Sequence, residues 1–561
     1  MKKLLLYGMT ALAALTSCND LLDKYPLDTF TNNQEYWNTA DNLDNQCNTF
    51  YNNYTGYGNG SGSGWFYFKT LSDDQVDAES HEWTYTNPVS ISSNWSSPFT
   101  EIRRANHILK GLQASTLEEK VKNHYAGIAR MNRAWQYYQL VRMYGDVQWI
   151  EIVIDPADTE NLYGPRTDRD LVMDKVLEDI NFACASITAN SNRQRFSIDM
   201  AYAMKADITL YEGTFCKYRT QAENGKPADT GRAQKYLQEC VSACEYLMGG
   251  KYELSESYKA IYNSISLAGN PEIIFYKPYA QSSLRHSTIN YTMNTSGTHG
   301  LSKDAFDSFL FLDGKPLATT SENTDDAAVL DEDGNYSIRA LLAVRDKRLS
   351  DILDPVLSFR DHTYSRAGAA GFTTSTGYGI AKYDNPDGMS VTERNNNGQQ
   401  YTDCPLYWLS IIYLNFAEAK AELGTLTQSD LDNTVNKLQA RAGLPAMTTT
   451  PDADPANNMG VSNLLWEIRR CRRCELIMDN WYRYWDLIRW HQLDKLDSKK
   501  YPNIMLGANV SNVPNCQEAT KNGYIDASDA QIRTYEAKHY LYPIPTGQLT
   551  LNKNLKQNPG W

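Results

Sequence analysis

The sequence has little positive charge and no long apolar segment beyond its start. Its 561 residues include 54 Lys and Arg against 67 Asp and Glu, which gives a net charge of −13. A protein that binds duplex nucleic acid normally presents a basic face, so this balance argues against that class. After the first twenty residues no run reaches eighteen apolar residues, so we expect the mature chain to lie on a membrane without crossing it. The 42% apolar and 22% charged residues are typical of a folded globular protein.

The short motifs of common catalytic classes are also missing. The chain has no HExxH, no GxSxG and no GxxxxGK[ST], the patterns that place zinc ligands, a nucleophilic serine and a phosphate-binding loop. The glycine-rich run 56–64 lacks GxGxxG spacing and a preceding apolar strand, so we interpret it as a flexible loop. With 67 carboxylates, the acid pair of a glycoside hydrolase stays open as an alternative, although no spacing favours it.

Two patterns suggest a metal or redox site, and neither has the right spacing. Cys471 and Cys474 form a CxxC without a second pair or paired histidines, so a core role is favoured. The acidic run 331–335 has the composition of a calcium loop, but Leu342 stands at the twelfth position, where a bidentate Glu belongs. A solvated acidic loop is favoured over a calcium site, and we predict no metal and no cofactor. Nine cysteines follow Cys18, and an odd number in an exported chain leaves at least one thiol unpaired.

The first eighteen residues are typical of a bacterial lipoprotein signal. Lys2 and Lys3 precede a short apolar stretch over residues 4–14, which is too short to span a bilayer. The stretch ends in LTSC, where small residues precede Cys18. We therefore predict a signal peptide over 1–17 and lipid attached to Cys18, which would anchor the chain to a membrane. The alternative is an ordinary secretory signal with a chance cysteine.

Helical spacing of apolar residues dominates the sequence outside its middle. Residues 169–187, for example, carry Val172, Val176 and Ile180 at helical intervals. Such spacing predicts helices over 117–144, 169–187, 199–219, 232–248, 405–423, 429–442 and 462–490. Between about 250 and 400 the pattern fades, and residues 272–276 (EIIFY) predict a short strand among Gly, Ser, Thr and Asn.

These patterns predict a mainly α fold in which tetratricopeptide-like helix pairs carry a loop-rich region with a few short β-hairpins. The length allows three or four domains, and one large helical array fits it as well. We divide the mature chain into a helical region over 18–249, a loop-rich ligand face over 250–400 and a second helical region over 401–561.

Tyrosine and tryptophan are abundant, whereas phenylalanine is scarce: 38 Tyr and 12 Trp stand against 15 Phe. Many of these rings lie among Gly, Ser, Thr and Asn, in groups that comprise Tyr51, Tyr54, Tyr57, Trp65 and Tyr67, then Trp83, Tyr85 and Trp95, then Tyr279 and Tyr291. Sugar rings have an apolar C–H face and a rim of hydroxyls, which an aromatic ring and neighbouring polar side chains match. The groups together predict a glycan-binding surface, although any single ring can instead fill a gap between helices.

A series of motifs resembles the SusD/RagB family of outer-membrane lipoproteins from Bacteroidetes nutrient-uptake systems. In chain order they are CNDLLDKYP over 18–26, LSDD over 71–74, IRRAN over 102–106, ARMNRAWQYYQLVRMYGDV over 129–147, LNFAEA over 414–419, VNKLQARAG over 435–443, RCEL over 473–476 with RYWDLIRW over 483–490, and YPIP over 542–545 with QNPG over 557–560. Gln148 stands where the family usually has proline.

The resemblance implies a SusD-like scaffold at the outer membrane, held by the lipid and exposed at the cell surface. It implies a partner, a SusC-like TonB-dependent transporter over which the lipoprotein closes as a hinged lid. The lid captures an oligo- or polysaccharide, or in some relatives a peptide, and breaks no bond. Charged residues of the motifs, namely Arg130, Arg133, Glu418, Glu475, Arg483 and Asp486, are expected to form ion pairs between helices.

The family carries no fixed sugar-binding motif, so the site residues are predicted from position along the chain. We predict Trp83 and Tyr85 as stacking platforms, with Asp74 and Asn87 as polar partners at the sugar rim. Tyr279, Arg285 and Tyr291 form a second candidate group for glycan binding. A lipid-anchored glycoside hydrolase on a helical scaffold is the alternative function.

Overall fold

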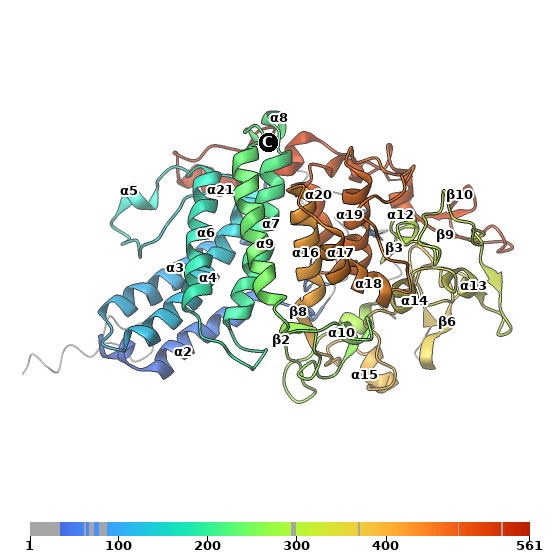
Figure 1. Ribbon diagram of the computed structural model, residues 1–561, viewed down its shortest axis with the longest axis horizontal. Coiled ribbons are helices and arrows are strands. Elements are labelled where there is room, and N and C mark those ends of the chain that lie inside the picture. The colour runs from blue at the N-terminus through green and yellow to red at the C-terminus, as the bar shows by residue number, and fades with distance from the viewer. Residues whose placement is uncertain are drawn as a thin grey trace, which may run out of the picture.

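The structure is a computed structural model that describes residues 34–60, 63–66, 72–77, 87–292, 299–368, 371–480, 482–528 and 531–561. Long helices fill the left and centre of Figure 1, and loops with short strands fill its right. The mainly α fold class predicted from the sequence is confirmed. None of the helices in the described part of the chain combines the length and the apolar character needed to cross a membrane.

The N-terminal half is an array of helices that pack in chain order. Its helices are α2 (Ala40–Asn48), α3 (Ser93–Ala114), α4 (Glu119–Tyr144), α5 (Thr159–Leu162), α6 (Arg169–Ser186), α7 (Ile198–Tyr218), α8 (Gln221–Asn224) and α9 (Thr230–Leu247), with 3-10 turns η1 (Gln34–Asn38) and η2 (Thr49–Asn53). Helix α3 packs on α4, α4 on α6, α6 on α7 and α7 on α9. Side-chain caps start several of them: Ser197 accepts a hydrogen bond from the Met200 amide at the start of α7, and Asp229 accepts one from the Arg232 amide at the start of α9.

The array continues across a long insertion. Helix α16 (Leu409–Glu422) packs against α9, although about 160 residues separate them in the sequence. Strands β2 (Ile273–Lys277) and β8 (Cys404–Trp408) pair antiparallel near the two ends of this insertion and hold its base together. The short strand predicted at 272–276 is therefore confirmed as β2.

Between β2 and β8 the chain forms short elements. They are α11 (Thr288–Asn290), β3 (His299–Leu301), α12 (Lys303–Asp307), β4 (Val329–Leu330), β5 (Tyr336–Ser337), α13 (Arg339–Leu342), α14 (Lys347–Ile352), β6 (Tyr364–Ser365), η4 (Arg366–Gly368), β7 (Gly371–Phe372) and α15 (Val391–Asn395); α10 (Ala260–Asn263) precedes β2. Strand β3 pairs with β1 (Gln75–Asp77), which ties this region to the N-terminal part of the chain.

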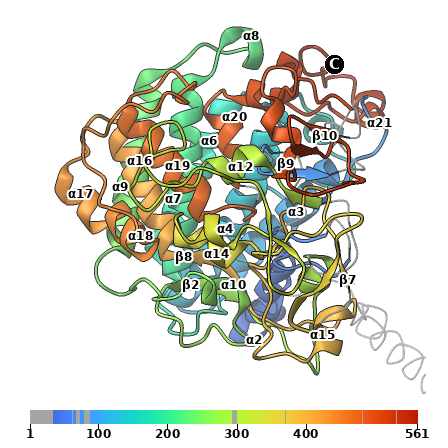
Figure 2. The same ribbon diagram turned by 90° about the vertical axis from the view of Figure 1, so that its right-hand side faces the viewer.

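The C-terminal part returns to helices and ends in short strands and turns. After α16 come α17 (Gln428–Asn433), α18 (Val435–Arg441), α19 (Asn463–Glu475), α20 (Tyr482–Arg489), η5 (Leu493–Leu496), η6 (Pro502–Met505), β9 (Leu506–Asn509), β10 (Thr520–Lys521), β11 (Tyr524–Asp526), η7 (Ala537–Tyr540) and α21 (Thr546–Leu551). Strands β10, β11 and β9 form a small antiparallel sheet. Figure 2 shows this sheet beside the short elements of the insertion, in front of the long helices.

Three predicted helices differ from the structure at their ends or in their middle. The segment predicted as one helix over 405–423 begins as strand β8, whose residues are all buried, before α16 starts. The helix predicted over 429–442 is broken at Thr434, whose backbone (φ −132°, ψ −92°) lies outside the helical region. The helix predicted over 462–490 is divided into α19 and α20 because Met478 and Asn480 adopt left-handed conformations, with φ of 62° and 47°.

Buried ion pairs connect these helices. Glu418 on α16 is fully buried and accepts hydrogen bonds from Arg489 Nη1 and Nη2 at 2.6 and 2.7 Å, and from Trp490 Nε1 at 2.6 Å. Arg489 also donates from Nε to Asp486 at 2.8 Å, and Arg472 on α19 donates from Nε to the other oxygen of Asp486 at 2.8 Å. Helices α16, α19 and α20 therefore share one network of opposite charges.

The other charged motif residues also pair. Arg133 on α4 donates to Asp179 on α6 at 2.7 and 2.8 Å, and Arg130 approaches Asp179 at 3.5 Å. Arg348 and Arg441 both donate to Glu475. The predicted ion pairs between helices are confirmed for Arg130, Arg133, Glu418, Glu475 and Asp486, whereas Arg483 pairs with Asp73 in the segment before β1.

We predict that Glu418→Gln lowers the free energy of unfolding at neutral pH by about 3–5 kcal/mol, because it leaves buried guanidinium charge uncompensated. Burial alone raises the pKa of Glu418, but the guanidinium groups of Arg489, Arg472 and Arg469 together outweigh burial and lower this pKa to about 2. The folded-state pKa lies below the unfolded value, so the stabilisation is present above about pH 4.5 and is lost as the pH falls toward 2.

Chemical denaturation at pH 7 and at about pH 3.5 measures this. The difference in free energy of unfolding between wild type and Glu418→Gln should shrink by roughly 1.4 kcal/mol between pH 7 and pH 3.5, because the wild-type stabilisation changes by about one pH unit's worth of proton linkage. An exposed control, Glu119→Gln, should change stability by less than about 0.5 kcal/mol. Equal stability of wild type and Glu418→Gln at pH 7 would show that the network does not hold α20.

Candidate functional site

Part of the predicted site lies outside the described residues. Cys18, Trp83 and Tyr85 belong to that part, so their roles stay predictions. Asn87 is exposed at the start of the segment that leads into α3. Strands β1 and β3 pair Asp77 with His299, which holds these two strand ends side by side.

Asp74 does not lie at an open surface, and its predicted role at a sugar rim disagrees with the structure. Its side chain is 2% exposed, and Oδ1 accepts a hydrogen bond from Arg473 Nε at 2.8 Å. The adjacent Asp73 binds Arg483 through both oxygens, at 2.7 and 2.6 Å. The Ser72–Asp74 segment thus fastens the chain before β1 to α19 and α20, which explains why carboxylates stand there.

The second predicted group is divided between the interior and the surface. Tyr279 is 6% exposed, and its hydroxyl donates to the carbonyl oxygen of Tyr57 at 2.5 Å, so its predicted role as a stacking platform also disagrees with the structure. Arg285 is half-buried and donates from Nη1 to Gln399 at 2.7 Å. Tyr291 is half-buried and packs against the core.

Most described rings around the glycine-rich loop face inward. Tyr54, Tyr57 and Trp95 are buried. The hydroxyl of Tyr57 donates to the Tyr262 carbonyl oxygen at 2.6 Å, and Trp95 packs edge-on against Tyr144. These rings fill gaps between elements, which was the alternative interpretation of any single ring.

Trp65 is different, because the loop that carries it holds its ring near the surface. The loop closes through a bridge between Tyr57 and Gly64, and the Trp65 amide donates to the Gly56 carbonyl oxygen at 2.9 Å. Gly64 has a φ of 89°, and a Cβ there would lie 2.4 Å from the amide nitrogen of Gly58, so only glycine fits. Trp65 is half-buried and follows this fixed turn.

Trp65 lines a hollow of about 250 Å³ between α4, α20 and the glycine loop, which we call the aromatic hollow. Its lining residues are Thr55, Gly64, Trp65, Asn94, Trp135, Gln139, Arg142, Met143, Asn480 and Trp485. Three indole rings thus stand beside amide, hydroxyl and guanidinium groups. Trp65 presents more of its ring than Trp135 or Trp485, which are 7% and 5% exposed.

Aromatic rings hold Arg142 in this hollow, and no carboxylate of the described residues forms an ion pair with it. Its guanidinium lies 4.2 Å from the ring centre of Trp485 and 4.7 Å from that of Tyr138. It donates from Nη2 to Gln139, while Arg142 Nε and Gln139 Nε2 find no hydrogen-bond partner among the described residues. No carboxylate oxygen of the described chain lies within 4.0 Å of the Arg142 nitrogens. Buried donors without partners are rare and costly, and the contacts of the guanidinium with Trp485 and Tyr138 offset part of that cost for Arg142.

The hollow continues inward as a small extension of about 30 Å³ that shares Trp135, Arg142 and Trp485 with it. The hydroxyl of Tyr211 there has no partner among the described residues. Asp207 accepts hydrogen bonds from Asn415 Nδ2 at 2.7 Å and from the Tyr482 hydroxyl at 2.9 Å, and burial raises its pKa.

The ion network of α20 positions the inner ring of the hollow. Trp485 precedes Asp486, which Arg472 and Arg489 hold at 2.8 Å each. Because Arg489 is bound in turn to Glu418, helix α20 can present only one face toward α4.

From the sequence, the motifs that contain Trp135, Arg142 and Trp485 are expected to be scaffold, and their place in the hollow is not predicted. Trp135 and Arg142 lie on one helix, but Trp485 follows more than 300 residues later, and no local spacing connects it to them. The abundance of tryptophan was the only signal in the sequence that pointed to them.

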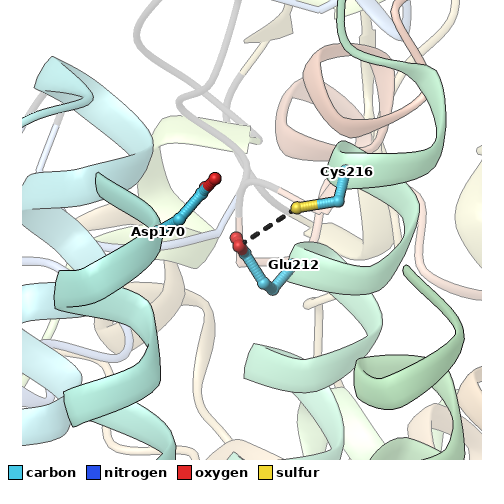
Figure 3. A group of neighbouring side chains, drawn as sticks. All are labelled: Asp170, Glu212 and Cys216. Atoms are coloured by element: carbon cyan, nitrogen blue, oxygen red, sulfur yellow. Dashed lines mark hydrogen bonds between the residues drawn. The ribbon is translucent and has the colours of Figure 1, made fainter. Parts of the chain in front are cut away.

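A group of possible metal ligands lies elsewhere, between α6 and α7. Figure 3 shows Asp170, Glu212 and Cys216, whose ligand atoms lie within 4.8 Å of one another. Arg169 Nη2 binds Glu212 at 2.5 Å, and Arg219 Nη1 binds Asp170 at 2.7 Å. Burial raises the pKa of Cys216, and its thiol donates to Glu212 at 3.2 Å. Guanidinium groups occupy the carboxylates, so the donor set fits an ion-pair network and not a cation site.

The acidic loop that was weighed as a calcium site forms the turn between β4 and β5. Asp331 Oδ1 accepts hydrogen bonds from the backbone amides of Asp333 at 3.1 Å and Asn335 at 2.8 Å. This carboxylate oxygen stabilises the turn itself.

Comparisons with known proteins agree with this architecture. Residues 271–561 match the model of the SusD family, and residues 63–210 match a family described as starch-binding and associating with the outer membrane. A search of curated proteins found no match.

Several solved structures share the fold at low sequence identity. A SusD-like carbohydrate binding protein from Bacteroides fragilis is 18% identical with a TM-score of 0.70, covering 93% of this chain and 100% of that one. A SusD-like protein from the same species is 21% identical with a TM-score of 0.65, over 96% and 100% of the two chains. A laminarin binding SusD-like protein is 18% identical with a TM-score of 0.54, over 93% and 99%.

We predict that one thiol of the folded, detergent-solubilised protein reacts rapidly with a disulfide reagent. Cys516 is half-buried, whereas the other eight cysteines of the described residues are buried. Burial raises the pKa of Cys471 to about 11 and of Cys474 to about 12, so little thiolate exists there at neutral pH. Cys516→Ser should remove the fast phase and Cys471→Ser should leave it unchanged, as followed by absorbance. Two or more fast thiols would contradict this packing.

Proposed function

The chain belongs to the SusD family, and from this we propose that it binds a glycan at the outer membrane, in the aromatic hollow, and does not cleave it. The matched family model covers residues 271–561, slightly more than half of the chain. Structural neighbours described as carbohydrate binding and as laminarin binding support a saccharide ligand. The aromatic hollow is the single observation that supports a location for this binding in the molecule.

The hollow suits a sugar because it offers both kinds of surface that a sugar ring needs. The indole of Trp65 would cover the apolar face of a ring. Arg142 and Gln139 line the same hollow and would hydrogen-bond the hydroxyl rim. Thr55 and Asn480 add further polar groups along the same wall.

The bonding of the acids beside the hollow supports binding without cleavage. Asp207 accepts hydrogen bonds from Asn415 and Tyr482, and Asp486 is held by Arg472 and Arg489. A glycosidase needs two carboxylates aimed at the scissile bond, one of them free to donate a proton. The bonding of these two acids supports a binding role over the hydrolase alternative.

The proposal extends to anchoring and transport. The lipid on Cys18 would hold the protein on the outer membrane with its ligand face at the cell surface. A SusC-like TonB-dependent transporter would be the partner over which the protein closes as a lid, passing an oligosaccharide into the pore. Stacking and a few hydrogen bonds give an affinity modest enough for that release. The family description that mentions the outer membrane supports this location.

The other residues predicted from the sequence remain candidates for contact with a longer glycan. We propose Trp83 and Tyr85 as additional stacking platforms with Asn87 as a polar partner, and Arg285 and Tyr291 as a second group.

We predict that Trp65→Ala weakens binding of the cognate polysaccharide by about 1–3 kcal/mol, the usual cost of removing an aromatic anchor. Isothermal titration calorimetry of the detergent-solubilised protein against a panel of plant, algal and host polysaccharides measures this. Trp561→Ala, which removes another half-buried indole near the C-terminus, is the matched control and should leave affinity unchanged.

Three results would count against the site or the activity. Equal affinity of Trp65→Ala and wild type would move the site away from the hollow. Weakening by Trp561→Ala to the same extent would mean a general loss of folding. Release of more saccharide product than protein present would replace binding with hydrolysis.

We also predict that affinity-tagged protein, solubilised from its native membrane in mild detergent, co-purifies with a large β-barrel transporter. Mass spectrometry of the eluate identifies the partner, and a tagged unrelated lipoprotein is the control. Recovery of the protein alone would contradict the lid model while leaving glycan binding intact.

A further inference from the structure

A second cavity lies in the C-terminal half, separate from the aromatic hollow. It holds about 360 Å³ between α19, α12 and the segments around residues 316–318, 454–459 and 495–504. None of its lining residues lines the aromatic hollow or its inner extension. The volume falls at the lower end of small-molecule sites, which run from roughly 300 to 1,000 Å³. We call it the arginine–aspartate cavity.

One part of its wall is apolar and aromatic. Trp466, Tyr501, Leu317, Met459 and Ile504 contribute it. The Trp466 ring is fixed in orientation, because Nε1 donates to Asp454 at 3.0 Å. A half-buried indole held in this way is a ready surface for the C–H face of a small ring.

Another part of the wall carries donors that the protein does not use fully. Lys495 is 5% exposed, and its Nζ donates to the Asn458 carbonyl oxygen at 2.9 Å and to the Tyr501 hydroxyl at 2.8 Å. An ammonium has three donors, and no carboxylate of the described residues lies within 4.0 Å of this one. Arg483 uses Nε and Nη2 on Asp73, which leaves Nη1 without a hydrogen bond to the described chain.

Acceptors stand in the same cavity. Asp307 binds Lys303 through Oδ2, whereas its buried Oδ1 has no partner among the described residues. Asp304 gives one oxygen to Arg473 at 2.8 Å and is partly exposed. A ligand that both donates and accepts hydrogen bonds would match Lys495, Arg483 and Asp304 together.

The balance of charge selects the class of ligand. Five cationic and four acidic side chains line the cavity, and most are paired with each other. An anion would meet the carboxylates and a cation would meet the guanidinium groups. A neutral molecule with many hydroxyls is repelled neither by the carboxylates nor by the guanidinium groups, and its hydroxyls match donors and acceptors alike.

We propose that the arginine–aspartate cavity binds a neutral saccharide of one or two rings, at a site distinct from the aromatic hollow. The apolar face of the sugar lies against Trp466. Lys495 and Arg483 donate to its oxygens, and the partly exposed Asp304 accepts from a hydroxyl. The inference does not depend on glycan binding in the hollow.

Saturation-transfer NMR on the detergent-solubilised protein tests the proposal. The probes are glucose, galactose, N-acetylglucosamine, maltose and cellobiose, with glucuronate and glucosamine as charged counterparts. We expect at least one neutral sugar to bind and the charged counterparts to bind more weakly. Lys495→Met removes a donor at nearly constant side-chain length and should weaken that binding about tenfold. Lys499→Met, an exposed neighbour on the same segment, should leave it unchanged.

Two further variants separate this site from the hollow and from a folding defect. Ala456→Trp places a ring at the exposed rim of the cavity without removing a charge, and it should block binding while thermal unfolding stays cooperative. Trp65→Ala should leave binding of the small sugar unchanged even where it weakens binding of the polysaccharide. Absence of any neutral sugar signal, stronger binding of a charged counterpart, or full binding by folded Lys495→Met and Ala456→Trp would each overturn the proposal.

Discussion

A buried network of guanidinium and carboxylate groups fixes the C-terminal helices, and the site depends on it. Glu418, Arg489, Asp486 and Arg472 are almost fully buried and bound to one another at 2.6–2.8 Å. Removing charges from water is so costly that each must find its partner, which leaves α20 one orientation against α16 and α19. Because Trp485 stands beside Asp486, this electrostatic constraint also fixes the inner wall of the aromatic hollow.

The hollow therefore results from three segments far apart in the sequence. Helix α4 supplies Trp135 and Arg142, α20 supplies Trp485, and a tight glycine turn supplies the half-buried Trp65. The long helices are built for rigidity, as the nearly complete burial of α7 illustrates. A rigid frame with a preformed aromatic hollow reduces the ordering cost of binding, which suits a protein that captures a flexible chain of sugars.

The sequence could predict the elements whose information is local. Helix α6 follows the spacing of Val172, Val176 and Ile180, and its predicted range 169–187 differs from the structure by a single residue. Strand β8 was missed because Leu406 and Trp408 fit the apolar spacing of the helix that follows. The break between α19 and α20 depends on left-handed Met478 and Asn480. Asn is enriched in that conformation but Met is not, and the apolar spacing continues across both residues.

Site residues were harder to predict, since exposure depends on distant partners. Asp74 looked available beside aromatic residues, but Arg473, about 400 residues later, binds its carboxylate. Tyr279 is likewise covered by a distant partner, because its hydroxyl donates to the carbonyl oxygen of Tyr57 in the glycine-rich loop. Conversely, Arg142 stands in a motif with structural residues, and only the fold shows that it faces rings and pairs with no acid of the described residues.

A crystal structure of the protein with a bound oligosaccharide tests the central claim most directly. We expect a sugar ring to lie with its C–H face against the indole of Trp65 and its hydroxyls within hydrogen-bond distance of Arg142 or Gln139. A ligand held at another surface, with the Trp65 ring left uncovered, would contradict the account.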